Sequence, residues 1–252
     1  MILGVLGVGH LATAIIVGLR RSGFAPSALL LSPRGRAGDL AQRFGVPIAV
    51  DNRDLVERSD VVLLSVRPAD APAAVTRLPW RSEQIVISAC AGVAMAQLLV
   101  APARLVRAMP LTAAEIAASP TVFFPDLPEA RSVLERLGPA IALAGEADFE
   151  VATVSAAVYG WAQDLIYRTT LWSAEKGAPP EAMRQLIAMT FVAAGRLIAE
   201  KPDRMEQMLT ELVTPGGITE LGLGILAAGD QPAVWRKACE AVLDRLTAGG
   251  GG

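Results

Sequence analysis

The stretch ILGVLGVGHLA, residues 2–12, decides the fold of this chain. Ile2–Leu6 is a short apolar run that predicts a buried strand, and Leu11–Arg21 has the apolar spacing of a helix. Strand-like and helix-like runs go on alternating through the first half of the chain, which is typical of βαβ units in a parallel sheet with helices on both faces. Further strands are expected at residues 28–31, 60–65, 84–88 and 104–108, and a helix at residues 37–44.

The turn between the first strand and the first helix, GVGHLA, fits the dinucleotide-binding pattern G-x-G-x-x-A. Gly7 permits the tight turn, Gly9 lets a pyrophosphate approach the backbone, and Ala12 keeps the helix close to the sheet. The helix N-terminus then offers N–H groups and a positive dipole end to the phosphates. We therefore predict a dinucleotide site at Gly7, Gly9 and Leu11. His10 is expected to lie near the pyrophosphate as a loop side chain rather than as a catalytic base.

The turn SPRGR, which follows the second predicted strand, bears on the choice of nicotinamide cofactor. NAD-specific sites place an acidic residue at this strand end, whereas NADP-specific sites place an arginine there. No acid occurs here before Asp39, while Ser32, Arg34 and Arg36 can hold a 2′-phosphate. The sequence therefore favours NADPH. The alternative is that the two arginines are only solvated loop residues.

The composition and charge of the chain exclude several classes of protein. Hydrophobic residues make up 52% of the 252 residues and aromatic residues 5%, which indicates a large aliphatic core. The net charge is −2 and no basic stripe is present, so we expect no nucleic-acid partner. His10 is the only histidine, which leaves no histidine-based metal cluster or catalytic triad, and we predict no metal.

Cysteine usage and the N-terminus indicate a cytoplasmic protein. Cys90 and Cys239 lie in apolar surroundings without CxxC spacing, and we interpret them as two buried, reduced thiols. The chain enters a strand at once, with no basic leader, so no signal peptide is expected. The uncharged stretch Ile85–Ala103 is interrupted by serine, glycine and proline, and we interpret it as strand, turn and helix rather than as a membrane span.

Only helical patterns follow from about Phe149 onward, so we predict two domains. Residues 1–147 would form a Rossmann-type NADP-binding domain, and residues 148–252 an all-helical domain. The helix Glu181–Glu200 is apolar nearly all round, and a helical region of this size is too thin to bury it alone. We infer an intertwined subunit interface and expect a homodimer or higher homo-oligomer. The glycine tail, residues 249–252, is expected to be disordered.

The segment Thr214-Pro215-Gly216-Gly217 and the nearby Thr219 form the second distinctive cluster. Pro215 fixes the entry to a turn, and the two glycines would leave backbone N–H groups uncovered at a helix start. Such a turn suits a carboxylate, with Thr214 and Thr219 bringing hydroxyls to the same place. A simple helix–helix turn explains the same residues equally well.

With this turn and the opening βα unit, further segments make the chain resemble the pyrroline-5-carboxylate reductase family over nearly its whole length. The matching segments are Val66-Arg67-Pro68, Ser88–Gly92, Arg107–Pro110 and Thr190–Leu223. The resemblance implies a Rossmann domain, a helical dimerisation domain, and an active site between one subunit's cofactor and the helical region of the dimer. It implies NADPH-dependent reduction of the C=N bond of 1-pyrroline-5-carboxylate to L-proline. It also implies cofactor contacts by Val66, Arg67, Pro68, Ala89 and Met109.

The resemblance further assigns roles in a substrate site. Gly216, Gly217 and Thr214 would hold the carboxylate of a small imino-acid substrate. Pro215 would shape the turn, and Thr219 would sit near the imine nitrogen. Because a threonine hydroxyl is a poor acid, it would orient an iminium that is already protonated, or relay a proton from water. Catalysis would then come mainly from alignment of the hydride donor with the C=N carbon.

The chain departs from the family pattern close to the expected active site. The family's Ser-Gly-Ser-Gly-Pro-Ala segment aligns with Ser155–Gly160, in which both glycines and the proline of that pattern are replaced and Tyr159 is present. Leu111 replaces an asparagine, and Ile218 replaces the residue that follows Gly-Gly. Tyr159 is either a proton donor or substrate contact, or a helix-buried aromatic. Three functions therefore stay open: reduction of pyrroline-5-carboxylate, reduction of another imine or a ketone, and non-catalytic NADP binding.

Overall fold

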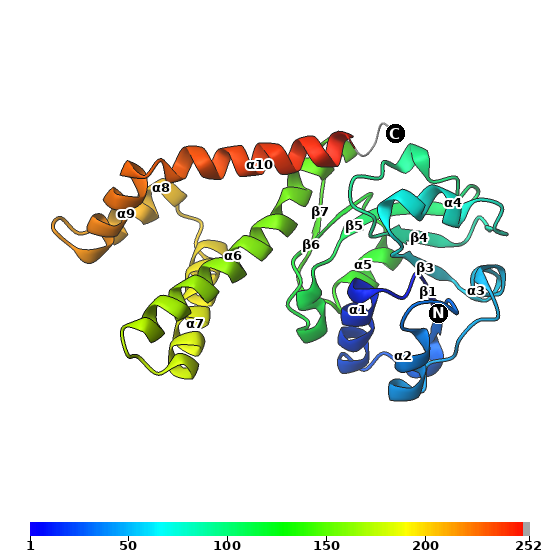
Figure 1. Ribbon diagram of the computed structural model, residues 1–252. Helices are drawn as coiled ribbons and strands as arrows, with labels where there is room; N and C mark the ends of the chain where they lie inside the picture. The colour runs from blue at the N-terminus through cyan, green and yellow to red at the C-terminus, as the bar shows by residue number, and fades with distance from the viewer. Residues whose placement is uncertain (249–252) are drawn as a thin grey trace. The chain divides into compact units, whose positions relative to one another are not determined.

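The computed structural model describes residues 1–248, and the tail 249–252, for which disorder is predicted, lies outside the described residues. The chain divides into two compact units. Among the described residues, the first unit contains residues 1–154 and 243–248, and the second contains residues 155–242. The predicted fold class, a sheet domain followed by a helical region, is confirmed (Figure 1). The domain boundary expected at residues 147 and 148 stays a prediction.

A seven-stranded sheet in the order β2-β1-β3-β4-β5-β6-β7 forms the centre of the first unit (Figure 1). The strands are β1 (Leu3–Leu6), β2 (Leu29–Leu31), β3 (Val61–Leu64), β4 (Ile85–Ser88), β5 (Arg104–Met109), β6 (Thr121–Phe124) and β7 (Ala140–Ala142). All neighbouring pairs are parallel except β5 and β6. The sequence predicts β1 to β5 but not β6 and β7, because both are short and only partly buried and therefore carry little pattern.

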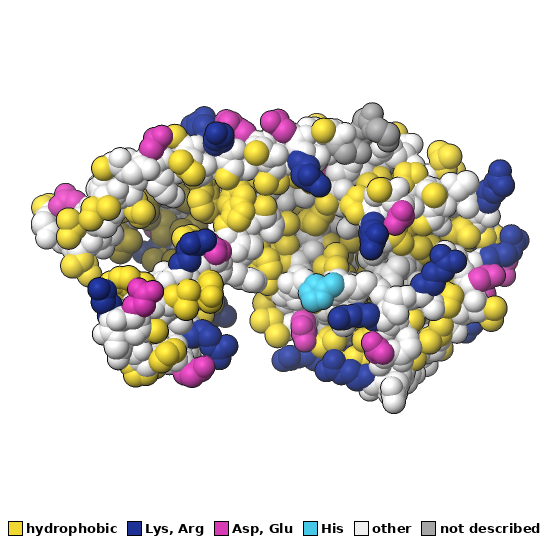
Figure 2. Space-filling view, viewed as in Figure 1, with side chains coloured by type: hydrophobic (Ala, Val, Ile, Leu, Met, Phe, Trp, Pro, Cys, Tyr) yellow, Lys and Arg dark blue, Asp and Glu magenta, His cyan; other side chains and the backbone are white. Residues whose placement is uncertain are grey.

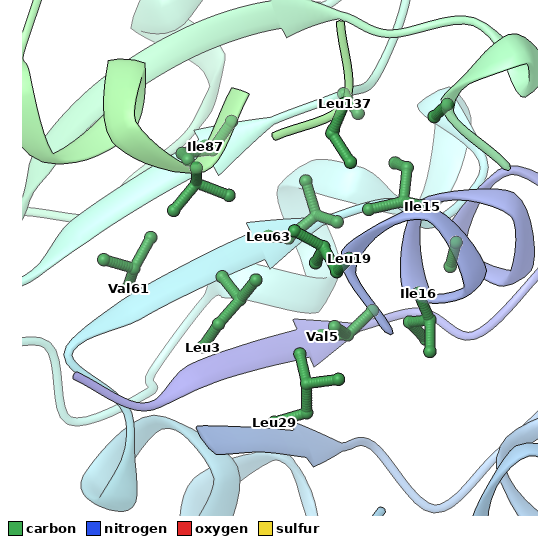
Figure 3. Close-up of a cluster of buried hydrophobic side chains, with 14 of the residues drawn as sticks. Leu3, Val5, Ile15, Ile16, Leu19, Leu29, Val61, Leu63, Ile87 and Leu137 are labelled. Atoms are coloured by element: carbon green, nitrogen blue, oxygen red, sulfur yellow. The ribbon is translucent and has the colours of Figure 1, made fainter. Parts of the chain in front are cut away.

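Helices cover both faces of the sheet because strand side chains alternate between two apolar clusters. One cluster includes Leu3 and Val5 and is shown in part in Figure 3. The helices that contribute to it are α1 (His10–Arg21), α2 (Ala37–Phe44) and α5 (Pro128–Leu134). The other cluster includes Val62 and Leu64, together with α3 (Asn52–Arg58) and α4 (Ala71–Val75). Short 3-10 turns lie at Pro26–Ala28, Pro68–Asp70, Met95–Gln97, Thr112–Ile116 and Glu146–Asp148.

Arg107 ties β5 to the start of the next long helix. Its side chain is buried, its Nη1 lies 3.2 Å from Glu146 Oε1, and it also pairs with Glu150. Its guanidinium carbon lies 4.1 Å from the centre of the Phe149 ring. Glu146 Oε1 in addition accepts the Met95 N–H at 2.8 Å. Because a buried guanidinium is tolerated only with such partners, Arg107 has a structural role at this junction.

The second unit consists of helices joined by short turns. The helices are α6 (Phe149–Glu175), α7 (Pro180–Glu200), α8 (Met205–Leu212), α9 (Ile218–Ala228) and α10 (Gln231–Ala248). The start of α6 and the end of α10 belong to the first unit. Pro180 is the first residue of α7 and Pro179 precedes it, as expected for proline at the start of a helix. No residue of α7 is buried in the single chain, and Figure 2 shows many hydrophobic side chains on the surface of the helices. By length and composition alone, α7 would suffice to cross a membrane.

Candidate functional site

Gly7 lies at the carboxyl end of β1, held between the ends of the two neighbouring strands. Its N–H donates to Ser32 Oγ after β2 at 3.0 Å, and its carbonyl accepts from Ser65 Oγ after β3 at 2.6 Å. A Cβ at Gly7 would stand 2.6 Å from Val66 Cγ1, and the φ angle is +96°. Only glycine therefore fits where β1 turns into α1.

The N-terminus of α1 is open to a ligand. Gly9 is the residue that precedes the helix, it makes no side-chain cap, and a Cβ built on it would meet no atom within 4 Å. His10 is exposed and Leu11 is half-buried on the same turn. Because the first turn of a helix leaves N–H groups without intrahelical partners, this open cradle fits the pyrophosphate of a dinucleotide.

The order of the strands reverses at this turn. β2 and β3 flank β1, and Ile48 makes a single parallel bridge to Leu31 beyond β2. Rossmann sheets bind dinucleotides outside the carboxyl ends of the strands at such a point. The other predicted cofactor residues follow the neighbouring strands, with Val66, Arg67 and Pro68 after β3, Ala89 after β4 and Met109 at the end of β5.

A cavity of about 600 Å³ opens at the same edge of the sheet. Its lining contains four predicted cofactor residues, Gly7, Ser32, Arg34 and Val66. It also contains three polar residues that the sequence patterns do not single out, Asn52, Asp70 and Thr76, and the apolar residues Leu6, Ala73, Ala74 and Leu78. Arg36 is not part of this lining. Guanidinium, hydroxyl and amide groups beside apolar surface suit a phosphorylated adenosine.

Asn52 is placed by α3, a helix that the sequence patterns do not reveal. Asp51 caps this helix by accepting the Asp54 N–H at 2.8 Å, so that Asn52 is its first residue. Asp51, as a capping residue, is the sequence feature that could have indicated the start of α3. Since Leu55 and Val56 are the buried residues of α3, the segment is too short to show an apolar period.

The second motif forms the turn between α8 and α9. Gly216 has a left-handed φ of +72°, and a Cβ on Gly217 would lie 2.4 Å from Thr214 Oγ1. The expectation that both glycine N–H groups are uncovered is wrong for this structure. Gly217 donates its N–H to the Thr214 carbonyl at 2.9 Å, and Gly216 donates its N–H to Glu220 Oε2 at 2.7 Å. The turn that begins at Pro215 is thus closed by contacts of its own.

Thr219 and Tyr159 lie on different helices of the second unit. Thr219 is half-buried on the first turn of α9, next to Ile218, which is 91% exposed. Tyr159 is half-buried on α6. Leu111 belongs to the first unit, where its side chain is buried and its N–H donates to Ser119 Oγ at 2.8 Å. The catalytic roles of Thr219 and Tyr159 stay predictions.

Comparison with known proteins gives a match in both halves of the chain. The family of coenzyme F420-dependent NADP oxidoreductases matches residues 2–92, and the pyrroline-5-carboxylate reductase dimerisation family matches residues 147–248. Among curated proteins, pyrroline-5-carboxylate reductase 2 of Bacillus subtilis is 28% identical, over 89% of this chain and 86% of its own length.

Solved structures share the fold over the whole chain. The 1-pyrroline-5-carboxylate reductase of Streptococcus pyogenes has a TM-score of 0.86 at 23% identity, with 98% of each chain covered. Pyrroline carboxylate reductase of Plasmodium falciparum, solved with NADP bound, has a TM-score of 0.87 at 18% identity and covers 99% of this chain and 98% of its own. With its dinucleotide fold and its matching helical region, this chain belongs to the pyrroline-5-carboxylate reductase family of NAD(P)H-dependent oxidoreductases that act on CH–NH groups.

Proposed function

We propose that this protein uses NADPH to reduce the C=N bond of a cyclic imine, with 1-pyrroline-5-carboxylate to L-proline as the leading reaction. The observation that carries the proposal is the turn at residues 214–219, which lies within the match to the pyrroline-5-carboxylate reductase dimerisation family. The same chain holds a Rossmann unit with an open helix N-terminus at Gly9. When bound there, NADPH would supply the hydride.

The cavity supports NADPH rather than NADH. Ser32 and Arg34 line it, and no acidic residue follows β2 before Asp39. A guanidinium and a hydroxyl bind a 2′-phosphate, whereas NAD-specific sites use a carboxylate at this position. Ser32 Oγ accepts the Gly7 N–H, which leaves its own O–H to donate to a phosphate oxygen. Asn52 would add an amide donor from the same lining.

In the substrate site, the turn from Thr214 to Gly217 would receive the carboxylate of an imino acid, and Thr219 would face the imine nitrogen. A cyclic iminium arrives already protonated, so the Thr219 hydroxyl would orient it rather than protonate it. Hydride addition to carbon, with the proton kept on nitrogen, gives the secondary amine. Tyr159 is the second candidate for this role. The main contribution of the chain would be alignment of the two reactants.

We also propose that the helical unit forms a homodimer or higher homo-oligomer. Leu186, Met189 and Leu197 of α7 are 59%, 56% and 51% exposed in the single chain. Because residues 147–248 match a dimerisation family, burial against a second copy, not within a membrane, would account for this apolar helix. Light scattering at micromolar concentration should show the oligomer, and a folded monomer would contradict it. A cytoplasmic location stays a prediction.

The function is tested by offering NADPH or NADH with a panel of cyclic imines and ketones. We expect NADPH to be consumed with 1-pyrroline-5-carboxylate and L-proline to be released. If the protein reduces only an imine of another ring size, that imine replaces 1-pyrroline-5-carboxylate as the proposed substrate. Tight NADPH binding without turnover of any compound would instead support a non-catalytic NADP-binding protein and would reject the proposal.

A further inference from the structure

The carboxylate of Glu220 lies on one of the N–H donors of the turn that precedes α9. Its Oε2 is 2.7 Å from the backbone nitrogen of Gly216. Among residues 1–248, Glu220 has no ion-pair partner. Its negative charge is therefore held by the Gly216 N–H and by the positive end of the α9 dipole.

This contact differs from an ordinary helix cap. A glutamate at the third helical position usually accepts from the N–H of the capping residue, which here is Gly217. That N–H is already given to the Thr214 carbonyl, and Glu220 accepts from Gly216, one residue earlier. Glu220 thus accepts a hydrogen bond from the Gly216 N–H, which in the proposed function binds the substrate carboxylate.

We propose that Glu220 determines substrate specificity by competing with the substrate carboxylate for the Gly216 N–H. The inference rests on the proposed function for its substrate turn. A carboxylated imine has to displace Glu220 and then lies close to its charge, whereas an imine without a carboxylate does neither. Because Glu220 is exposed, its side chain can move into solvent without burying a charge. Glu220 therefore disfavours carboxylated imines relative to uncharged ones.

The variant Glu220→Gln tests this, because it keeps an acceptor for the Gly216 N–H and removes the charge. Glu211→Gln on α8 is the matched control, since it removes the same charge from a side chain that accepts from a neutral amide, Gln207 Nε2 at 2.9 Å. For each protein, kcat/KM is measured with 1-pyrroline-5-carboxylate and with 1-pyrroline, the same ring without the carboxylate.

We expect the ratio of these two kcat/KM values to rise about tenfold in Glu220→Gln, mainly through a lower KM for the carboxylated imine. The ratio should stay unchanged in Glu211→Gln. A ratio in Glu220→Gln that is unchanged or lower would overturn the proposal and leave Glu220 as a helix cap.

A binding measurement separates this inference from the proposed function. L-proline and pyrrolidine, the same ring without the carboxylate, are titrated into the NADP⁺-loaded proteins by calorimetry. L-proline should bind about tenfold more tightly to Glu220→Gln than to the unmodified protein, while the affinity of pyrrolidine should not rise. Equal or absent L-proline binding in both proteins would refute the competition. Absence of turnover with either imine in the unmodified protein would refute the proposed function instead.

Discussion

Arg36 donates its backbone N–H to the carbonyl oxygen of Val8 at 2.9 Å. This hydrogen bond joins the turn after β2, which carries Arg34, to the glycine turn after β1. Gly35 makes the approach possible, since its φ is +70° and a Cβ there would lie 2.3 Å from the Val8 carbonyl oxygen. The proposed 2′-phosphate and pyrophosphate contacts are therefore positioned by one backbone contact.

Gly35→Ala should lower both thermal stability and NADPH affinity. The added methyl group has to move the Val8 carbonyl, and a positive φ costs about 1–3 kcal/mol in a residue other than glycine. At this chain length, 1 kcal/mol corresponds to roughly 2–4 °C in Tm. Gly38→Ala is the control, because Gly38 lies in α2 with open space around it. The Tm of this variant should be unchanged or raised. Equal Tm values for the two variants would show that the contact with Val8 does not constrain the turn.

The substitution Arg34→Ala should weaken the binding of NADPH far more than the binding of NADH. A charge-assisted phosphate contact is worth about 1.5–3 kcal/mol, so the Kd for NADPH should rise roughly 10- to 100-fold. Arg36→Ala should have a smaller effect, because Arg36 lies outside the cavity lining and its backbone contact survives the change. The double variant should lose most of the preference. Fluorescence titration with both cofactors measures this, and equal affinities in the unmodified protein would reject the assignment of NADPH.

Thr219→Val removes a hydroxyl and changes the side-chain volume very little. If that hydroxyl orients the iminium in the transition state, kcat should fall roughly 10- to 100-fold with little change in KM. Steady-state kinetics with the best substrate of the panel measures the split, with Tyr159→Phe run in parallel. An unaltered kcat in Thr219→Val would mean that the turn binds only the carboxylate. Tyr159 would then be the first candidate for the group that orients the iminium.

Burial raises the pKa of the Cys90 thiol to about 11 from its ordinary 9.0, although hydrogen bonds to neighbouring groups partly oppose the shift. The unfolded chain therefore loses this proton at lower pH than the folded chain does. Stability from the neutral thiol is complete below pH 9 and is lost between about pH 9 and 11, at up to about 1.4 kcal/mol per pH unit. In Cys90→Ala, the free energy of unfolding measured with denaturant should decline less steeply in this pH range, and parallel curves for the two proteins would contradict the assignment.

The other cysteine differs from the sequence prediction. Cys239, expected to be buried, is only half-buried.

The sequence predicts the elements whose side chains are buried on a regular period. β1 and β3 are continuous apolar runs because both of their faces are covered, and such runs are recognisable without a structure. β7 is partly exposed and three residues long, so no comparable signal exists. In the site, Gly7 and Arg34 follow predicted strands and could be named. The bond from Gly216 to Glu220 depends on how one exposed turn closes, which no residue pattern specifies.

Hydride transfer from NADPH to an imine carbon is the central claim, and isotope transfer tests it most directly. NADPH with deuterium at both transferable positions of the nicotinamide is incubated with 1-pyrroline-5-carboxylate and the protein, and the product is examined by mass spectrometry and NMR. We predict proline with one deuterium, on the ring carbon that was double-bonded to nitrogen, for each NADPH oxidised. Proline without deuterium, or NADPH oxidation without loss of the imine, would contradict the claim.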